Sequence, residues 1–229
     1  MEFPLVLKSC INGSFGTIHT YTDGHIYDAY FIYLDGNVNT ELMADFKSRW
    51  GNRSFVCLTP IWQEALTTTY PELFCTRRSV MAYNSNCENI NQLIEYTYHI
   101  PEGYRLNAID EEVFKMNPLG FVSNYKSFED FKSNGSGYVV WSNEKIVSLA
   151  SSVLMFDNDV ELNLYTFNEH RRKGLGIACS AAMLIDCIER QINIHWDAQN
   201  VASRSMAEKL GYEFHHAYNA YTFFEVKEP

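Results

Sequence analysis

The sequence has few charged residues and no long apolar run. Charged side chains make up 20% of the 229 residues, too small a share for a chain that stays disordered through charge repulsion. No stretch of about 18 uncharged apolar residues occurs, so we expect no membrane-spanning helix. The first residues also lack the basic segment and the apolar run of a secretory signal. We therefore expect a cytoplasmic protein without a membrane partner.

The sequence also lacks an excess of positive charge. Its 18 lysines and arginines face 28 aspartates and glutamates, which gives a net charge of −10. No block of about five or six like charges occurs. A surface of this balance repels polyanions, so nucleic acid is not an expected partner. It favours the approach of a cationic amine, although many proteins are this acidic for solubility alone.

Paired metal-ligand motifs are missing as well. None of the six cysteines belongs to a C-x-x-C pair, which argues against zinc and thioredoxin-type sites. The adjacent pair His215-His216 lacks an identifiable third ligand. We therefore expect no metal, and cysteines that stay reduced as in the cytosol.

The sequence does contain enough apolar residues for a large core. They make up 46% of the chain and aromatic residues 15%, and no internal repeat or low-complexity tract is present. Two turn-prone segments, 84–89 and 101–103, mark a change of pattern between them. We therefore predict two domains, a mixed α/β region over residues 1–100 and a second domain over 101–229.

Local patterns in the first region alternate between strand and helix. Residues 11–21 and 25–34 are rich in β-branched and aromatic side chains and flank Asp23-Gly24, a pattern that predicts a β-hairpin. The other predicted elements are helices over 41–50 and 62–70 and strands over 55–58 and 77–83.

The second region contains a strand–helix–strand unit. Residues 160–166 alternate as a strand, 175–190 repeat as a long apolar helix, and 192–198 form a second strand. Two strands joined in this way are expected to be parallel, with a right-handed crossover. The remaining predictions are helices over 110–116, 127–133 and 202–210, with Asn200 before the last helix and Gly211 after it, and strands over 138–141, 146–154, 213–216 and 221–226.

The loop inside that unit reads Arg171-Arg172-Lys173-Gly174-Leu175-Gly176-Ile177. Its two glycines let backbone N–H groups approach an anion without a Cβ in the way. The helix start behind them adds unpaired N–H groups and the positive end of a helix dipole, and three cations add charge. The loop therefore predicts a pyrophosphate site. The P-loop and dinucleotide fingerprints are both absent.

The whole segment resembles the acetyl-CoA signature of the GNAT superfamily of N-acetyltransferases. Arg171, Gly174 and Gly176 match its Q/R-x-x-G-x-G/A motif, directly after a strand. The stretches 196–203 (WDAQNVAS) and 208–212 (EKLGY) are similar to its second motif. The resemblance is strong over about 137–229. The residues of the second motif are most similar to those of the group that contains the zwittermicin A resistance acetyltransferase. The resemblance implies an α/β fold of the α+β type, in which helices flank a mixed central sheet with two splayed parallel strands.

The resemblance also implies acetyl-CoA as cosubstrate and assigns residues to it. The acyl-pantetheine arm would pair with the first strand, and the loop would hold the pyrophosphate. A residue from the second strand and one from the helix behind it would lie near the arm, although both also suit a helix start. The implied cofactor-binding residues are Leu164, Tyr165, Thr166, Arg171, Arg172, Lys173, Gly174, Leu175, Gly176, Ile177, Asn200 and Ser203.

The implied reaction is a direct attack of an amine on the thioester carbon. A base must take the proton of the amine, and Glu161 on the first strand and Asp197 on the second are the candidates. A backbone N–H at 164–166 can stabilise the oxyanion.

The leaving thiolate also needs a proton, and here the sequence departs from the family. Many members carry a tyrosine proton donor where this chain has Ala207. Tyr165, Tyr212, Ser203 or water could take its place.

Three functions follow from these features. The first is an N-acetyltransferase that acts on a small-molecule amine, for example an antibiotic, with residues 1–100 shaping the acceptor side. The second is a non-catalytic sensor or interaction module that binds acyl-CoA, which only the missing tyrosine supports. The third is a protein N-acetyltransferase, which would need an acidic groove for a lysine tail. The expected assembly is a monomer or a homodimer.

Overall fold

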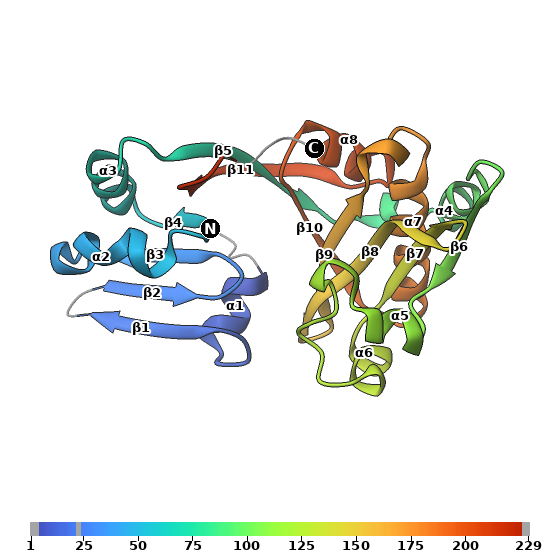
Figure 1. The fold of residues 1–229 in the computed structure, drawn as a ribbon, viewed down its shortest axis with the longest axis horizontal. Coiled ribbons are helices and arrows are strands. Elements are labelled where there is room, and N and C mark those ends of the chain that lie inside the picture. The colour runs from blue at the N-terminus through green and yellow to red at the C-terminus, as the bar shows by residue number, and fades with distance from the viewer. Residues whose placement is uncertain (1–4, 22–23, 226–229) are drawn as a thin grey trace. The chain divides into compact units, whose positions relative to one another are not determined.

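The computed structural model describes residues 5–21 and 24–225, which form two compact units (Figure 1). The first unit extends to Val80 and resumes at His216, and the second comprises Met81–His215. The chain therefore passes between the units twice, within the strands β5 (Phe74–Ala82) and β11 (Glu213–Thr222). The sequence placed a single boundary near residue 100, whereas the compact units divide earlier and the chain returns to the first unit at its end.

The first unit contains an antiparallel ribbon and three helices. Strands β1 (Thr17–Tyr21), β2 (Gly24–Asp28) and β3 (Ile32–Gly36) are antiparallel neighbours, and β4 (Phe55–Cys57) runs parallel to β3. The end of β11 then pairs antiparallel with β4, with Tyr221 opposite Phe55. The helices are α1 (Leu5–Ile11), α2 (Thr40–Trp50) and α3 (Pro60–Thr69).

The core of this unit is aromatic. Phe46 of α2 is fully buried and its ring contacts those of Trp50, Phe55 and Trp62 at centroid distances of 5.1, 4.8 and 6.4 Å. The Nε1 atoms of the two tryptophans donate to Asp28 and to the Asp35 carbonyl, so burial leaves neither indole N–H unpaired. The high aromatic content of the sequence is thus used for packing here.

The second unit is built on five neighbouring strands in the order β10-β9-β8-β7-β6. All neighbours are antiparallel except β10 and β9, which are parallel. The strands are β6 (Tyr104–Ala108), β7 (Gly137–Ser142), β8 (Lys145–Phe156), β9 (Asp159–Thr166) and β10 (Asn193–Ala198). The helices are α4 (Ile90–Tyr98), α5 (Glu111–Met116), α6 (Phe128–Asn134), α7 (Leu175–Glu189) and α8 (Val201–Lys209), with 3₁₀ turns at η1 (Ser85–Glu88), η2 (Pro118–Gly120) and η3 (Asn168–His170). This mixed α/β arrangement confirms the predicted fold class.

Two cores lie on the two faces of this sheet. One packs α7 and α4 against Val160, Ile194 and Trp196, and the other packs α5 and α6 against Val139 and Leu149. The long helix predicted over 175–190 is α7, whose buried residues include Ala178, Ala181, Met183 and Leu184. The parallel strand–helix–strand unit is therefore confirmed.

Most predicted elements are present, and several differ. The single strand predicted over 25–34 is two antiparallel strands, β2 and β3. The region starts with helix α1 rather than with a strand from residue 11, and α4 and β6 were not predicted. The strands predicted over 213–216 and 221–226 are one strand, β11, because its end is held by pairing with β4. Two predicted positions, Asp23 in the hairpin turn and residue 226 in the last strand, lie outside the described residues.

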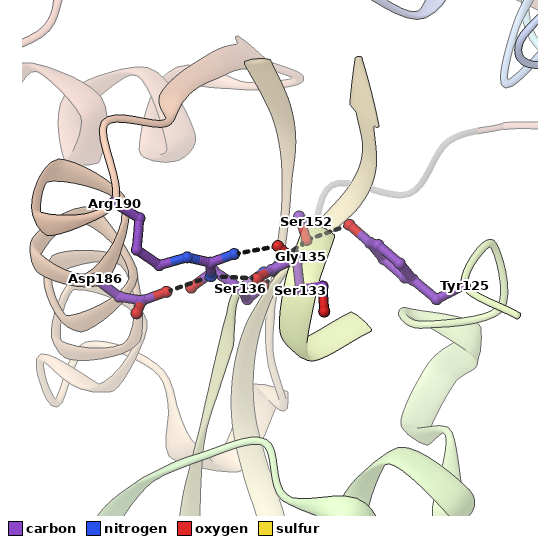
Figure 2. A network of polar contacts seen from close by, with 7 residues as sticks. All are labelled: Tyr125, Ser133, Gly135, Ser136, Ser152, Asp186 and Arg190. Carbon is purple, nitrogen blue, oxygen red and sulfur yellow. Dashed lines mark hydrogen bonds and ion pairs between the residues drawn. The ribbon is translucent and has the colours of Figure 1, made fainter. Parts of the chain in front are cut away.

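A polar network attaches α6 to α7 and β8 (Figure 2). At the end of α7, Arg190 donates to the carbonyls of Gly135 (2.6 Å) and Ser133 (2.7 Å) and pairs with Asp186 (3.2 Å). Arg190 thus binds carbonyl groups at the C-terminal end of α6, where a helix leaves them without intrahelical partners.

The same network includes the buried hydroxyl of Ser152. It lies 3.2 Å from the Ser136 carbonyl and 3.0 Å from the Ser136 N–H, and 2.5 Å from the Tyr125 hydroxyl. Because Ser152 has one proton, which it donates to the carbonyl, it accepts from both other groups. These bonds fix the chain on either side of α6.

We expect Arg190→Ala to lower the stability of the second unit by about 2 kcal/mol, because two charge-assisted bonds to backbone carbonyls are lost. Urea unfolding measures the change. Lys115→Ala is the control, since Lys115 forms an exposed i,i+4 pair with Glu111, and such pairs contribute about 0.5 kcal/mol or less. Equal effects of the two substitutions would contradict this role of Arg190.

Candidate functional site

The parallel pairing of β9 and β10 ends early. It comprises Asn193↔Asp159, Ile194↔Val160 and His195↔Glu161, although β9 continues to Thr166 and β10 to Ala198. Beyond these three pairs each strand goes on without the other. This is the separation of two parallel strands that the sequence resemblance implied.

Beyond Glu161, one edge of the β9 backbone is paired with β8, and the other edge is not paired with β10. Phe167 N donates to Val147 O of β8, and Tyr165 lies opposite Leu149. Because successive residues of a strand direct their backbone groups to opposite edges, the N–H groups of Leu164 and Thr166 point to the edge from which β10 has separated. The Thr166 carbonyl on that edge accepts from Arg171 Nε at 2.8 Å.

The side chains of the two strands divide between the two faces of the sheet. Leu162, Leu164 and Trp196 pack in the core that contains α7, whereas Tyr165 packs in the core that contains α5 and α6. Alternation therefore places Glu161 on the face of Tyr165, and Asp197 on the same face of β10. The structure thus brings the two predicted base candidates to one face, close to where the pairing ends.

A histidine joins them there. His195 lies opposite Glu161 in the register, and its Nε2 is 3.1 Å from Asp159 Oδ1. Trp196, between His195 and Asp197, is 3% exposed. Trp196 is therefore a core residue, and its neighbours on both sides present polar groups to the opposite face.

The predicted phosphate loop leads from η3 into α7. Gly174 is the N-cap of α7 with φ +79°, and Arg172 has φ +58°. Within residues 5–21 and 24–225, the backbone N–H groups from Arg172 to Ile177 donate to no protein acceptor. Six successive N–H groups at a helix start are the donors that an anionic group requires.

Gly176 lets the start of α7 pack closely against β9. A Cβ at this position would lie 3.1 Å from Thr166 Oγ1 and 3.2 Å from Met206 Cε. A larger residue would therefore move the helix start away from the strand end. The glycine, the free N–H groups and the cationic side chains together fit a pyrophosphate, so the residues present suit acetyl-CoA.

The three cations of the loop have different surroundings. Arg171 holds the Thr166 carbonyl and lies over the Tyr165 ring, 5.7 Å from its centroid. Lys173 Nζ donates to the Tyr104 hydroxyl at 2.9 Å and to the Glu169 carbonyl at 3.3 Å. Arg172 is exposed. Arg171 therefore fixes the strand end, while Arg172 and Lys173 supply charge on the outside.

Asn200 and Ser203 have clear local functions. Asn200 caps α8, since its side chain accepts from Ser203 N at 2.9 Å. The Ser203 hydroxyl in turn accepts from Trp196 Nε1 at 3.1 Å. The capping function predicted for Asn200 is confirmed. A contact of either residue with a cosubstrate remains a prediction.

The structure narrows the choice of proton donor. Ala207 is fully buried, and Tyr212 is 2% exposed and donates to the Ile194 carbonyl at 3.0 Å. Burial raises the pKa of Tyr212 well above its usual value, which makes it a poor acid. Tyr212 is therefore a core residue. Tyr165 contacts Phe167 edge-on, with a centroid distance of 5.1 Å.

Tyr104 and His170 lie beside the loop, and neither was predicted to contribute to it. Tyr104 of β6 contacts both Lys173 and His170, the latter through a 3.0 Å contact between its hydroxyl and Nδ1. Tyr104 precedes the loop by more than 60 residues, so no local pattern could link them.

Among the described residues, no group of three or more His, Cys, Asp or Glu could hold a metal ion. None of the described helices is long and apolar enough to cross a membrane.

Most of the chain matches a known protein family. A profile described as GNAT acetyltransferase matches residues 5–221. The chain is 29% identical over 131 residues to the uncharacterized N-acetyltransferase YdfB of Bacillus subtilis, a match that covers 55% of this chain and 50% of that protein. The chain thus matches about half the length of this relative.

Solved structures show the same fold. A GCN5-related N-acetyltransferase-like protein from Streptococcus suis superposes with a TM-score of 0.82 at 24% identity, over 96% of this chain and 92% of that one. A GCN5-related N-acetyltransferase from Kribbella flavida gives a TM-score of 0.60 at 12% identity, over 94% and 92% of the two chains.

Proposed function

Because this chain belongs to the GNAT acetyltransferase family, we propose that it transfers an acetyl group from acetyl-CoA to the amine of a small molecule. The observation that carries the proposal is the pairing of β9 and β10, which ends at His195↔Glu161 although β9 continues to Thr166, together with the free N–H groups of the loop that follows β9. A site for the acyl donor and a row of polar side chains thus lie on adjoining segments. Acetyl-CoA, which the family generally uses, supplies the acetyl group as a thioester.

The chain would hold the donor through its backbone. The N–H groups of Arg172 to Ile177 would bind the pyrophosphate, helped by the positive end of α7. The edge of β9 at Leu164 and Thr166 would bind the pantetheine arm. One of these two N–H groups would also donate to the oxygen that becomes negative in the transition state.

The acceptor amine must lose its proton before it attacks. Glu161 and Asp197 are the proposed bases, because they lie on the same face of neighbouring strands where the pairing ends. Attack forms the amide bond and breaks the carbon–sulfur bond, so the sulfur needs a proton in exchange. Tyr165 lies on that face too, whereas the hydroxyl of Tyr212 is held in the core.

A thiol-release assay with acetyl-CoA and a panel of amines tests the proposal. Release above the acceptor-free background with at least one amine supports an enzyme. Binding of CoA without release across the panel would favour the sensor module, for which the buried Ala207 is the supporting observation. Acetylation of lysine peptides but of no small amine would favour a protein acetyltransferase. A preference for antibiotic amines would support the likeness to the zwittermicin A resistance group.

We expect Glu161→Gln to lower kcat about 100-fold, since removal of a general base typically costs a factor of this size. The dissociation constant of CoA, measured by calorimetry, should stay within twofold. Asp197→Asn is the matched substitution on the neighbouring strand. Whichever variant loses kcat identifies the base, and full activity in both would refute a carboxylate base.

A further inference from the structure

The phosphate loop is attached to a strand that lies far from it in the sequence. Tyr104 begins β6 and lies opposite Ser142 of β7 in the antiparallel register. Its half-buried ring packs against the core that contains α7. Its hydroxyl reaches two residues of the segment between β9 and α7, His170 and Lys173, at 3.0 and 2.9 Å. The side chain therefore has a fixed base and a polar end at the loop.

The chemistry of the three groups fixes the direction of one bond and permits a single donor for the other. An ammonium group can only donate, so the Tyr104 oxygen accepts from Lys173. The hydroxyl proton is then available for His170 Nδ1, and we infer that Tyr104 donates it. In this arrangement the imidazole proton of neutral His170 lies on Nε2. One hydroxyl thus orders a cation and a histidine of the same loop.

The ring of Tyr104 adds to this arrangement. Lys173 Nζ lies 5.5 Å from its centroid, and the His170 ring meets it nearly edge-on at 5.8 Å. A further bond from Lys173 to the Glu169 carbonyl uses a second ammonium proton. Two of the three ammonium protons are then directed to the protein, and the third is left for another acceptor.

We propose that Tyr104 is a positioning residue for the acyl donor, because it holds Lys173 and His170 in the conformation that receives the phosphate groups. This inference rests on the proposed function and extends it to a residue outside the loop. A lysine on an exposed loop loses rotamer freedom when it binds an anion. Tyr104 imposes that loss before the donor arrives, so binding is tighter.

Tyr104→Phe in the full chain is the direct test, because it removes the hydroxyl and keeps the ring. The dissociation constant of CoA should rise about fivefold, the range expected when one long side chain is no longer ordered in advance. The dissociation constant of pantetheine, which has no phosphate groups, should not change. Calorimetry measures the first and NMR titration the second.

The control is Tyr83→Phe, whose hydroxyl donates to Glu88 and not to the loop; it should leave both constants unchanged. In a Lys173→Met background, Tyr104→Phe should add less than a twofold effect, because both substitutions remove the same interaction. Nitrogen-15 NMR should show the Nε2–H form of His170 in the native chain and a mixture of tautomers in Tyr104→Phe.

Two results would overturn the inference. One is an unchanged CoA affinity in Tyr104→Phe, and the other is an equal loss for CoA and pantetheine, which would indicate general damage to the site. If the native chain fails to bind CoA at all, the proposed function is wrong and this inference is overturned with it.

Discussion

Gly211→Ala should destabilise the second unit by about 3 to 4 kcal/mol, a large effect for the addition of one methyl group. Gly211 follows α8 with φ +95°, which L-residues rarely adopt. A Cβ there would lie 2.5 Å from the Asn86 carbonyl carbon and 2.7 Å from Cys87 N. Both are backbone atoms, so no side-chain rotation can relieve the collision. We expect the thermal midpoint to fall by about 10 °C.

Gly103→Ala separates the two causes of this effect. Gly103 has φ +86°, nearly the same, but its Cβ would meet nothing within 4 Å. This variant should therefore lose only the backbone strain, about 1 kcal/mol. Comparable thermal midpoints for the two variants would show that the contact between Gly211 and η1 does not matter.

Gly174→Asp should weaken CoA binding about 30-fold without unfolding the chain. A Cβ at Gly174 has room, since its nearest contact is the His99 carbonyl at 3.5 Å. Aspartate is one of the residues that tolerate a left-handed backbone. Its carboxylate would lie beside the bound pyrophosphate, and repulsion at this range costs about 2 kcal/mol. Calorimetry with CoA measures the change.

Gly174→Asn is the matched control, because asparagine has the same shape and tolerates the same backbone without a charge. It should bind CoA within about threefold of the native chain. Raised salt should reduce the difference between the two variants, since mobile ions screen charges at an exposed loop. Equal losses in both variants at all salt concentrations would show that the charge at position 174 has no effect, which would contradict a pyrophosphate beside Gly174.

The elements that the sequence predicted are those defined by a local pattern. The strand at 160–166, the long apolar helix from 175 and the cap at Asn200 each depend on residues close together in the chain. The phosphate loop was predicted for the same reason, because glycines, cations and a helix start follow one another. Their order also required parallel strands, and the register of β9 and β10 confirms it.

Two elements were missed for different reasons. Ile90, Leu93 and Ile94 of helix α4 do follow helical spacing, but the helix lies between the two turn-prone segments, 84–89 and 101–103, that the sequence marked as a domain boundary. Strand β11 continues through Asn219, a poor strand former. Pairing with β4 outweighs that preference, and the partner strand lies more than 160 residues earlier in the chain.

The site was predictable only in part, for a related reason. The loop itself is local, but Tyr104 lies 69 residues before Lys173. The common face of Glu161 and Asp197 depends on how two strands are placed side by side. The core position of Tyr212 depends on its bond to Ile194. None of these relations leaves a mark in a short window of sequence.

The two passages of the chain between the units affect the order of events on the ribosome. Strand β4 is synthesised early, but its antiparallel partner is the end of β11, where Ala220 lies opposite Val56. The intervening second unit must be translated before that partner exists. The first unit therefore cannot complete its sheet before β11 has been translated, although most residues of its aromatic core have emerged long before. Nascent chains expose this strand edge until then, a state in which chaperones bind.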